Sequence, residues 1–410
     1  MTSTVPPVTE HPSAPFPWPR PPIDPPAEYQ WLRENAPITR VEIFGGEYAW
    51  LVTRYDDVRS ILSDPRVSAD SRKPGYPRFG APPESEDQRL FLRMDGAEHE
   101  IFRNLLAKNF TLTAMKKIRP ALQELVDSTI DAMLATPEGQ TDFVKAVALP
   151  IPSTVLSWIL GVHAEDRAFF NKAADEALMA NDLTNPDAMG RAIAAMNDLR
   201  GYIRKIANER AALDDPGDDI IGQLVAAERA GTITMMDVEN SGFLLIIAGH
   251  DTTTNMTALG MYTLLQHPEQ WAQMQESPTL VRNAVEELLR YLTVVHLVIL
   301  RSSTEDIEIG GVTIPAGEAI IPLNLSANRD DAHFPGADAL DIHRKARDHF
   351  AFGYGVHQCI GQALARLELQ IIFETLARRV PTLKLAAPPE ELQFKAWSGI
   401  NGVFSLPVTW

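Results

Sequence analysis

The chain has 410 residues, and its 37 lysine and arginine residues are outnumbered by 54 aspartate and glutamate residues, which gives a formal net charge of −17. This balance argues against nucleic acid as the main partner, because affinity for nucleic acid comes from neutralising phosphates. The single cysteine, Cys359, excludes an intramolecular disulfide and a cysteine-rich zinc site. No apolar run reaches the ~18 residues of a membrane span, and the first residues lack the apolar core of a secretory signal. We expect a cytoplasmic protein.

Proline is concentrated at the start of the chain, where ten of the 31 prolines lie between Pro6 and Pro26. Such density favours extended backbone and prevents a regular helix. We expect residues 1–27 to form a tail and a strap laid over one large domain at 28–410. Helical periodicity dominates that domain. It predicts helices at 98–109, 115–134, 188–213, 234–266, 268–275, 280–292 and 362–379.

Two helix starts carry recognisable signals. Thr234 followed by Asp237 resembles a capping box, and Pro268 suits a first helical position. Strand signals are fewer: a β-prone stretch at 49–53, a hairpin at 306–309 and 312–314 around two glycines, and a last strand pair near 397–408. The prediction is a mainly α fold with small β-sheets.

The segment FGYGVHQCIG at 352–361 is the most informative part of the sequence. Its three glycines indicate a tight loop in which the backbone approaches another group closely. Amide groups and the dipole at the start of the following helix favour the thiolate of Cys359. The segment is not a dinucleotide fingerprint, because Gln358 stands where the third glycine belongs. The cysteine alone leaves two interpretations open: an inert buried thiol, or a sulfur ligand to a large flat cofactor.

The same segment resembles the haem-binding loop of the cytochrome P450 superfamily, F-x-x-G-x-H-x-C-x-G, with Phe352, Gly355, His357, Cys359 and Gly361 in place. In that family haem iron is held by a cysteine thiolate. The resemblance implies that Cys359 is the iron ligand of haem b, that Phe352 packs against it, and that His357 contacts a haem propionate.

The predicted helix at 234–266 contains a conflict, since AGHDTTT at 248–254 brings poor helix formers into an apolar stretch. Such disagreement is expected at functional sites, although a polar face toward solvent is an alternative. Threonine hydroxyls can bond to the carbonyl four residues earlier and open the helix. The segment resembles the oxygen-binding pattern A-G-x-[D/E]-T-[T/S] of the family. The resemblance implies that Asp251 and Thr252 deliver protons during oxygen activation, and that Ala248 and Gly249 leave room over the iron.

Glu287 and Arg290 stand three residues apart in AVEELLRYL, a spacing that usually indicates a solvated ion pair. Here the helix is otherwise apolar, and the pair resembles the buried Glu–Arg pair of the family, whose third member would be Arg344. The resemblance implies a structural role. Leu340 stands where the family commonly has phenylalanine, which we interpret as a packing variation.

Three cationic residues resemble the family's contacts to haem propionates. His99 and Arg103 lie four residues apart on one predicted helix face. Arg301 stands in the segment VILRSSTEDIEIGG. Taken alone, the pair of His99 and Arg103 would more often be a surface pair.

These motifs occur in the order of the family from about residue 28 to 408, and the chain is identified as a member of the cytochrome P450 superfamily. Phrases such as AWLVTRYDDVRSILSDPRVS resemble soluble bacterial members of the actinomycete type. The resemblance implies a haem-thiolate monooxygenase that inserts one atom of O2 into a hydrophobic, medium-to-large substrate: a macrolide, a terpenoid or sterol-like compound, or a xenobiotic. Hydroxylation is the expected reaction. Two alternatives are a peroxide-driven haem-thiolate oxidase and a non-enzymatic haem-binding sensor.

The sequence contains no flavin or nicotinamide domain, so we expect electrons from NAD(P)H to arrive through a separate ferredoxin and ferredoxin reductase. A basic patch for this donor is predicted at Lys108, Lys116, Lys117 and Arg119, although a patch of this kind is more often solvated surface. We expect a monomer.

Substrate contacts are predicted by region. Family position implies a pocket lined by Ile247, Val294, Val295 and Ile400. Residues 178–185 are expected to form a lid, and 72–94 an irregular loop. In that loop Arg72, Lys73 and Arg78 could meet a polar end of the substrate, with surface solvation as the more common role of such residues.

Overall fold

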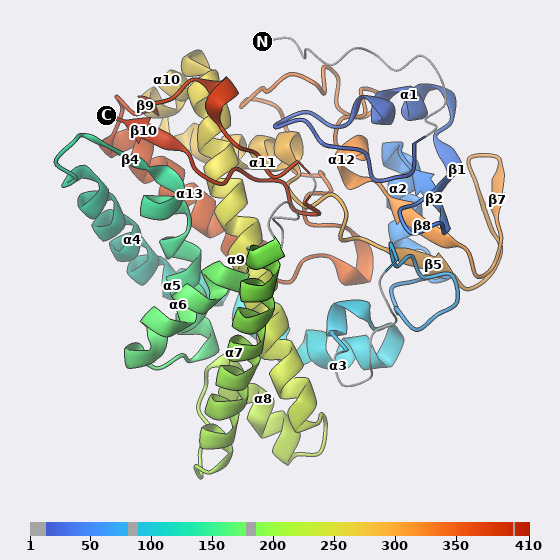
Figure 1. The fold of residues 1–410 in the computed structure, drawn as a ribbon, viewed down its shortest axis with the longest axis horizontal. Helices are drawn as coiled ribbons and strands as arrows, with labels where there is room; N and C mark the ends of the chain where they lie inside the picture. Colours follow the sequence, from blue (N-terminus) through green and yellow to red (C-terminus); the bar gives the residue numbers. More distant parts are fainter. Residues whose placement is uncertain (1–13, 81–88, 178–185, 397) are drawn as a thin grey trace.

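A long central helix, α9 (Met235–Gln266), organises the molecule (Figure 1). The computed structural model describes residues 14–80, 89–177, 186–396 and 398–410. Helices α5, α7, α8, α10, α11 and α13 all contact α9. The other α-helices are α1 (Ala27–Asn35), α2 (Tyr55–Ser63), α3 (Gly96–Ala107), α4 (Leu112–Leu134), α5 (Pro150–Leu160), α6 (Arg167–Ala177), α7 (Pro186–Ala211), α8 (Ile220–Arg229), α10 (Pro268–Glu276), α11 (Val281–Leu292), α12 (Asn324–Ala327) and α13 (Gln362–Arg379).

All seven helices predicted from periodicity are present, with ends within three residues of those expected. The capping box that opens α9 is confirmed: the Thr234 hydroxyl accepts from the Asp237 amide, and the Asp237 carboxylate accepts from the Thr234 amide at 2.8 Å. Pro268 opens α10 as predicted. Helices α1, α2, α5, α6, α8 and α12 were not predicted. They are short, so periodicity has few turns in which to register.

The strands form three small sheets among the described residues. The largest has the order β1-β2-β8-β5-β3 and lies across the molecule from α4 and α13 (Figure 1). Its β2 and β8 pair in parallel, whereas β1–β2, β5–β8 and β3–β5 are antiparallel. The strands are β1 (Ile38–Glu42), β2 (Tyr48–Val52), β3 (Val67–Ser68), β4 (Gln140–Asp142), β5 (Arg301–Ser303), β6 (Ile307–Ile309), β7 (Val312–Ile314), β8 (Ala319–Pro322), β9 (Lys384–Leu385) and β10 (Pro407–Thr409).

Two of the three strand predictions agree with the structure. The stretch at 49–53 is β2, and the hairpin is β6–β7, joined by Gly310 and Gly311, both at positive φ. The predicted strand pair at 397–408 is wrong. Only β10 forms there, and it pairs with β4 and β9, because its partners come from distant segments.

The proline-rich strap, described from Ala14 onward, is tied to the body by backbone groups. Phe16 forms an isolated bridge with Ile43. The guanidinium of Arg20 is fully buried and donates to the Thr293 carbonyl at 3.0 Å, at the end of α11. Residues 1–13 of the predicted tail lie outside the described residues.

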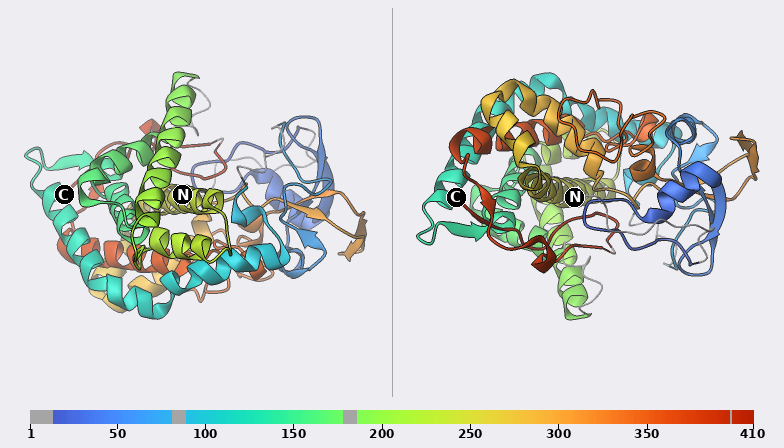
Figure 2. Two further views of the ribbon diagram at one scale, coloured as in Figure 1. Left: turned by 90° about the horizontal axis from the view of Figure 1, so that it is seen from below. Right: turned by 90° about the horizontal axis from the view of Figure 1, so that it is seen from above.

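Two apolar clusters pack against different parts of α9 along its length. Its first half, through Ile246, packs with α3, α6, α7 and α8. Its last part, from Met256, packs with α4, α11 and α13. Figure 2 shows α7 (green) projecting beyond the rest of the molecule. The middle of α9, at 247–255, therefore lies between the two clusters. In the described part of the chain, no helix combines the length and the apolar character needed to cross a membrane.

Candidate active site

The middle of α9 is accessible on one side, although its flanks are buried. Ala248 is exposed, and Ile247, Gly249 and Thr252 are partly exposed, while Ile246 and Thr253 are buried. An accessible alanine and threonine inside a helix that crosses the core indicate a cavity along this face.

The loop that carries Cys359 is shaped by backbone contacts. The Cys359 amide donates to the Phe352 carbonyl at 2.8 Å, which closes the loop. Gly355 has φ +74°, and a Cβ on it would lie 2.4 Å from the Leu62 carbonyl oxygen. Only glycine fits at this position. The sequence motif thus has a local physical cause.

The thiol of Cys359 is accessible although it lies deep in the protein. Its side chain is exposed, yet burial among protein atoms raises its pKa. The amides of Gly361 and Gln362 and the charges of Arg103 and Arg366 act in the opposite direction and favour the thiolate. The sulfur is thus accessible in a setting that is otherwise surrounded by protein atoms.

Cationic and imidazole side chains gather beside this loop. Arg103 in α3 donates to the Gln358 carbonyl at 2.7 Å, one residue before the cysteine. The rings of His99 and His357 are 4.2 Å apart. Burial first, and then the positive potential of His357 and Arg103, lowers the pKa of His99 to about 4. Arg301 is buried and contributes to the same potential. The structure therefore brings all four predicted propionate contacts into one cluster.

Asp95 is a member of this cluster that the sequence reasoning missed. Its Oδ1 accepts from the Ala69 amide at 2.9 Å and lies 3.7 Å from His357 Nε2, and Ser68 donates to its other oxygen. Burial would raise the pKa of Asp95, but these contacts outweigh burial and lower it. An aspartate just before a helix normally indicates an N-cap, and that interpretation hides its contacts to distant residues.

These residues fit a haem. An accessible sulfur lies at the start of α13, and two buried or half-buried arginines and two histidines surround the same loop with Asp95 as their nearby carboxylate. Two propionates would supply the missing negative charge.

The acid and the alcohol of the α9 motif have different partners. The Thr252 hydroxyl donates to the Ala248 carbonyl at 2.6 Å, the backward bond expected of threonine in a helix. The helix nevertheless continues unbroken to Gln266, so the predicted opening is absent from the structure. Asp251 is buried, and its Oδ1 accepts from Asn255 Nδ2 at 2.5 Å and lies 3.4 Å from Lys395 Nζ. Asn255 and Lys395 were not predicted as site residues, because they lie outside the motif.

Gly249 also contacts α5. A Cβ on Gly249 would lie 2.8 Å from Leu156 Cδ2 in α5, so the missing side chain allows α5 and α9 to pack closely. Ala248, by contrast, is exposed. The neighbouring His250 is buried and its Nδ1 is 2.9 Å from Ser153 Oγ.

Two buried ion networks extend from α11. Glu287 lies 2.8 Å from Arg290 Nε and 3.2 Å from Arg344 Nε, with Glu287 and Arg290 fully buried. The second network was not predicted: Glu286 pairs with Arg366 of α13 at 2.8 Å and with His349 at 3.2 Å. This network joins α11 to α13, the helix that follows Cys359. Glu286 and Arg366 are 80 residues apart in sequence.

Three of the four predicted pocket residues come together. Val295 forms an isolated bridge with Ile400, and the Asn401 amide donates to the Val294 carbonyl at 2.8 Å. Val294 is buried, whereas Val295 and Ile400 are partly exposed. Ile247 belongs to the accessible face of α9 and packs beside the other apolar cluster. The predicted lid at 178–185 and residues 81–88 of the predicted loop lie outside the described residues.

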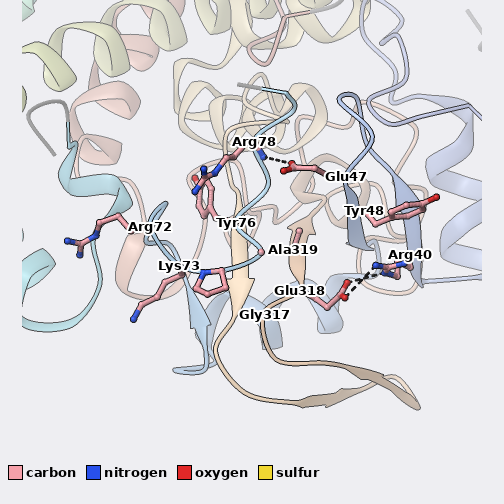
Figure 3. A pocket seen from close by; sticks show the side chains of 12 residues that line it. Arg40, Glu47, Tyr48, Arg72, Lys73, Tyr76, Arg78, Gly317, Glu318 and Ala319 are labelled. Atoms are coloured by element: carbon pink, nitrogen blue, oxygen red, sulfur yellow. Dashed lines mark hydrogen bonds and ion pairs between the residues drawn. The ribbon is translucent and has the colours of Figure 1, made fainter. Parts of the chain in front are cut away.

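A surface cleft of about 380 Å³ lies where the first part of that loop meets the sheet (Figure 3). Arg72, Lys73 and Arg78 line it, as do Arg40 and Glu318, which pair at 3.0 Å. Arg72 pairs with Asp70 at 2.7 Å. Much of the charge in the cleft is thus neutralised within the protein, in agreement with solvated surface residues.

The four residues of the predicted basic patch lie on two adjoining helices. Lys108 follows α3 in a short 3-10 helix, and Lys116 and Lys117 are on α4; all three are exposed. Arg119 is half-buried and lies 3.9 Å from Glu374. The exposed apolar side chain of Leu112 lies between them in the chain, with 77% of its surface accessible.

Comparison with known proteins agrees with this arrangement. The family model for cytochrome P450 matches residues 24–381. The chain is 44% identical to cytochrome P450-SU2 of Streptomyces griseolus over 391 residues, 95% of this chain and 94% of that one, and 42% identical to the vitamin D3 dihydroxylase of the same species over 100% and 99%. The crystal structure of cytochrome P450 MoxA from Nonomuraea recticatena superposes with a TM-score of 0.88 at 43% identity, covering 97% of this chain and 98% of that one. The chain belongs to the cytochrome P450 family and is a monooxygenase that works with haem iron, dioxygen and reducing equivalents from NAD(P)H.

Proposed function

We propose that Cys359 is the axial thiolate of haem b, held in the loop between the propionate contacts and α13. The observation that carries this assignment is the accessible sulfur in a buried setting, next to the cluster of His99, Arg103, Arg301 and His357. Phe352 fixes the loop through its carbonyl, and Gly361 gives its amide to the sulfur. When bound, haem supplies the activation of dioxygen for insertion of one oxygen atom into the substrate.

Asp251 and Thr252 provide protons for this reaction. A buried carboxylate and a partly accessible hydroxyl on successive residues can move a proton from the protein interior to the cavity along α9. Ala248 leaves space beside the hydroxyl. The intact acid–alcohol pair favours oxygen chemistry driven by reduction over a peroxide-driven oxidase or a haem sensor, because neither of these needs a delivered proton.

The substrate is a hydrophobic, medium-to-large molecule, and hydroxylation is its reaction. The support is the apolar character of Ile247, Val294, Val295 and Ile400, together with a relative named for dihydroxylation of vitamin D3. Macrolides, terpenoid or sterol-like compounds and xenobiotics fit this description.

Electrons come from an acidic ferredoxin and its reductase, docked at Lys108, Lys116, Lys117 and Arg119. Three of these side chains are exposed on a chain whose formal net charge is −17, and local complementarity speeds encounter. A monomeric state and a cytoplasmic location stay predictions, as does the division into a strap at 1–27 and a haem domain at 28–410.

One experiment tests the assignment of the thiolate. The reduced, CO-bound protein is expected to show the red-shifted Soret band of thiolate-ligated haem, and Cys359→His is expected to abolish that band while haem is retained. A red-shifted band in Cys359→His would overturn the assignment. Turnover with NADH, ferredoxin and reductase, compared with peroxide alone, separates the monooxygenase from its two alternatives, and a ferric spin-shift screen identifies substrates.

A further inference from the structure

Asp251 contacts Lys395, which lies in the chain segment that precedes β10. This segment passes beside α9 (Figure 1). We call residues 394–396 and 398–403 the C-terminal loop. Its two arms are joined by a bridge between Phe394 and Val403 and by a hydrogen bond from the Lys395 amide to the Gly402 carbonyl at 2.8 Å. The strap secures the loop, since the Arg20 amide donates to the Ala396 carbonyl at 3.1 Å.

Four residues form a closed ring of contacts at this crossing. Lys395 Nζ lies 3.4 Å from Asp251 Oδ1, and Asn255 Nδ2 donates to the same oxygen at 2.5 Å. Gly402 abuts Asn255 so closely that a Cβ would lie 1.9 Å from Asn255 Oδ1. The hydrogen bond between Lys395 and Gly402 completes the ring. The position of the Asp251 carboxylate is thus determined by the loop as well as by α9.

The ion pair is nearly closed to water. The side chain of Lys395 is 10% accessible and that of Asp251 is 1% accessible. A buried carboxylate needs a cation beside it, and removal of that cation leaves the carboxylate without its compensating partner. The Thr252 hydroxyl bonds instead to the Ala248 carbonyl within α9. Lys395 therefore contacts Asp251, the acid of the pair, and not the Thr252 hydroxyl.

We propose that Lys395 is a positioning residue of the proton relay, which holds the Asp251 carboxylate in place against the C-terminal loop; this inference rests on the proposed role of Asp251. The C-terminal loop also carries Ile400. A substrate that contacts Ile400 therefore contacts the same loop that positions Asp251. The loop thus links the occupied pocket to proton delivery.

The test compares Lys395→Met, which keeps the length of the side chain and removes its charge, with Lys395→Arg and with Lys384→Met, a control at an exposed lysine in β9. In the reconstituted holoenzyme, Lys395→Met is expected to lower product formation by about tenfold, which is less than the roughly 10²–10⁴-fold contribution of a group that transfers the proton itself, and to raise the solvent deuterium isotope effect. Lys395→Arg is expected to restore both. The CO-bound Soret band and the substrate-induced spin shift are expected to stay unchanged, which excludes a merely structural defect.

A double variant separates this inference from the proposed function. If Lys395 acts through Asp251, then Asp251→Asn combined with Lys395→Met is no slower than Asp251→Asn alone. Additive losses would overturn the positioning role, as would a normal rate and isotope effect in Lys395→Met while Asp251→Asn is slow. A normal rate in Asp251→Asn would instead contradict the relay itself. Gly402→Ala, which pushes on Asn255 without altering charge, is expected to raise the isotope effect in the same direction.

Discussion

Arg103 Nη1 donates to the carbonyl of Gln358, so a side chain of α3 holds the peptide that leads into Cys359. The helix and the loop are 255 residues apart in sequence. An arginine in this position affects the sulfur in two ways: it orients the loop, and its positive charge favours the thiolate. It can do so while other guanidinium nitrogens meet a propionate, because guanidinium offers five donors.

Arg103→Met is therefore expected to weaken haem retention. The buried carbonyl loses its donor, which costs about 1–3 kcal/mol, and the sulfur loses a favourable charge. The measurements are the haem-to-protein absorbance ratio after gel filtration and the melting temperature of the holoprotein. Arg119→Met serves as control, since that half-buried arginine has a long ion pair of 3.9 Å. Equal haem content in the two variants would contradict the role of Arg103.

Thr252→Ala is expected to uncouple NADH consumption from product formation. Without the hydroxyl, protons reach the cavity without the positioning that Thr252 gives, and the product formed per NADH consumed falls to about one tenth. NADH consumption and product are measured in the same reaction. Thr263→Ala removes a buried hydroxyl near the C-terminal end of the same helix and is expected to leave the ratio of product to NADH unchanged. An unchanged ratio in Thr252→Ala would remove the hydroxyl from the relay.

Glu287→Gln is expected to destabilise the protein strongly. Glu287 and Arg290 are fully buried, so loss of one partner leaves a buried charge without compensation, at a cost of about 3–5 kcal/mol. Denaturant unfolding measures this loss. Glu374→Gln breaks an exposed pair and is expected to change the free energy of unfolding by less than about 1 kcal/mol. Similar effects of the two substitutions would contradict the structural role of Glu287.

The long helices were predictable because each repeats its apolar pattern over several turns, as in α4, α7 and α9. The motif around Cys359 was predictable because a close contact, Gly355 against Leu62, allows only glycine there. Pairings between distant segments were not predictable. The strand β10 binds β4 and β9, and nothing in its three residues specifies those partners.

The same limit applies to the site. Asp251 was found from its motif, whereas its partner Lys395 lies 144 residues away in a segment without a motif. Asp95 and Glu286 were missed for a related reason, since each makes its decisive contacts through folding of remote segments. The close packing of Gly249 against Leu156 of α5 was missed in the same way. Site residues could be predicted from the sequence where their motif lies within a short segment of the chain.

Stability is expected to fall with acid through His296. Burial first, and then the charge of Arg20, lowers the pKa of His296 to about 3 from an ordinary value of 6.5, against a hydrogen bond to the Ser398 carbonyl. The unfolded chain binds the proton more readily, so the contribution is complete above pH 6.5 and is lost as the pH falls toward 3. The slope is at most about 1.4 kcal/mol per pH unit.

His296→Gln is expected to flatten this dependence, because glutamine does not titrate. Free energies of unfolding at a series of pH values between 4 and 7 measure the slope. His343→Gln, at an exposed histidine, is the control and is expected to keep the slope of the parent protein. An equal slope in His296→Gln and the parent would show that other groups determine the acid dependence.

Reversal of charge at Lys108 is expected to weaken docking of the ferredoxin. The side chain is exposed, as are those of Lys116 and Lys117, and a rim charge acts mainly on the rate of encounter. Lys108→Glu should therefore raise the KM for ferredoxin by about three- to tenfold, with the rate at saturating ferredoxin preserved. The difference should shrink at high salt, because the screening length falls from about 10 Å at 0.1 M to 3 Å at 1 M. Lys384→Glu makes the same change in net charge on β9, so an equal rise in its KM would attribute the effect to total charge and contradict a local docking patch.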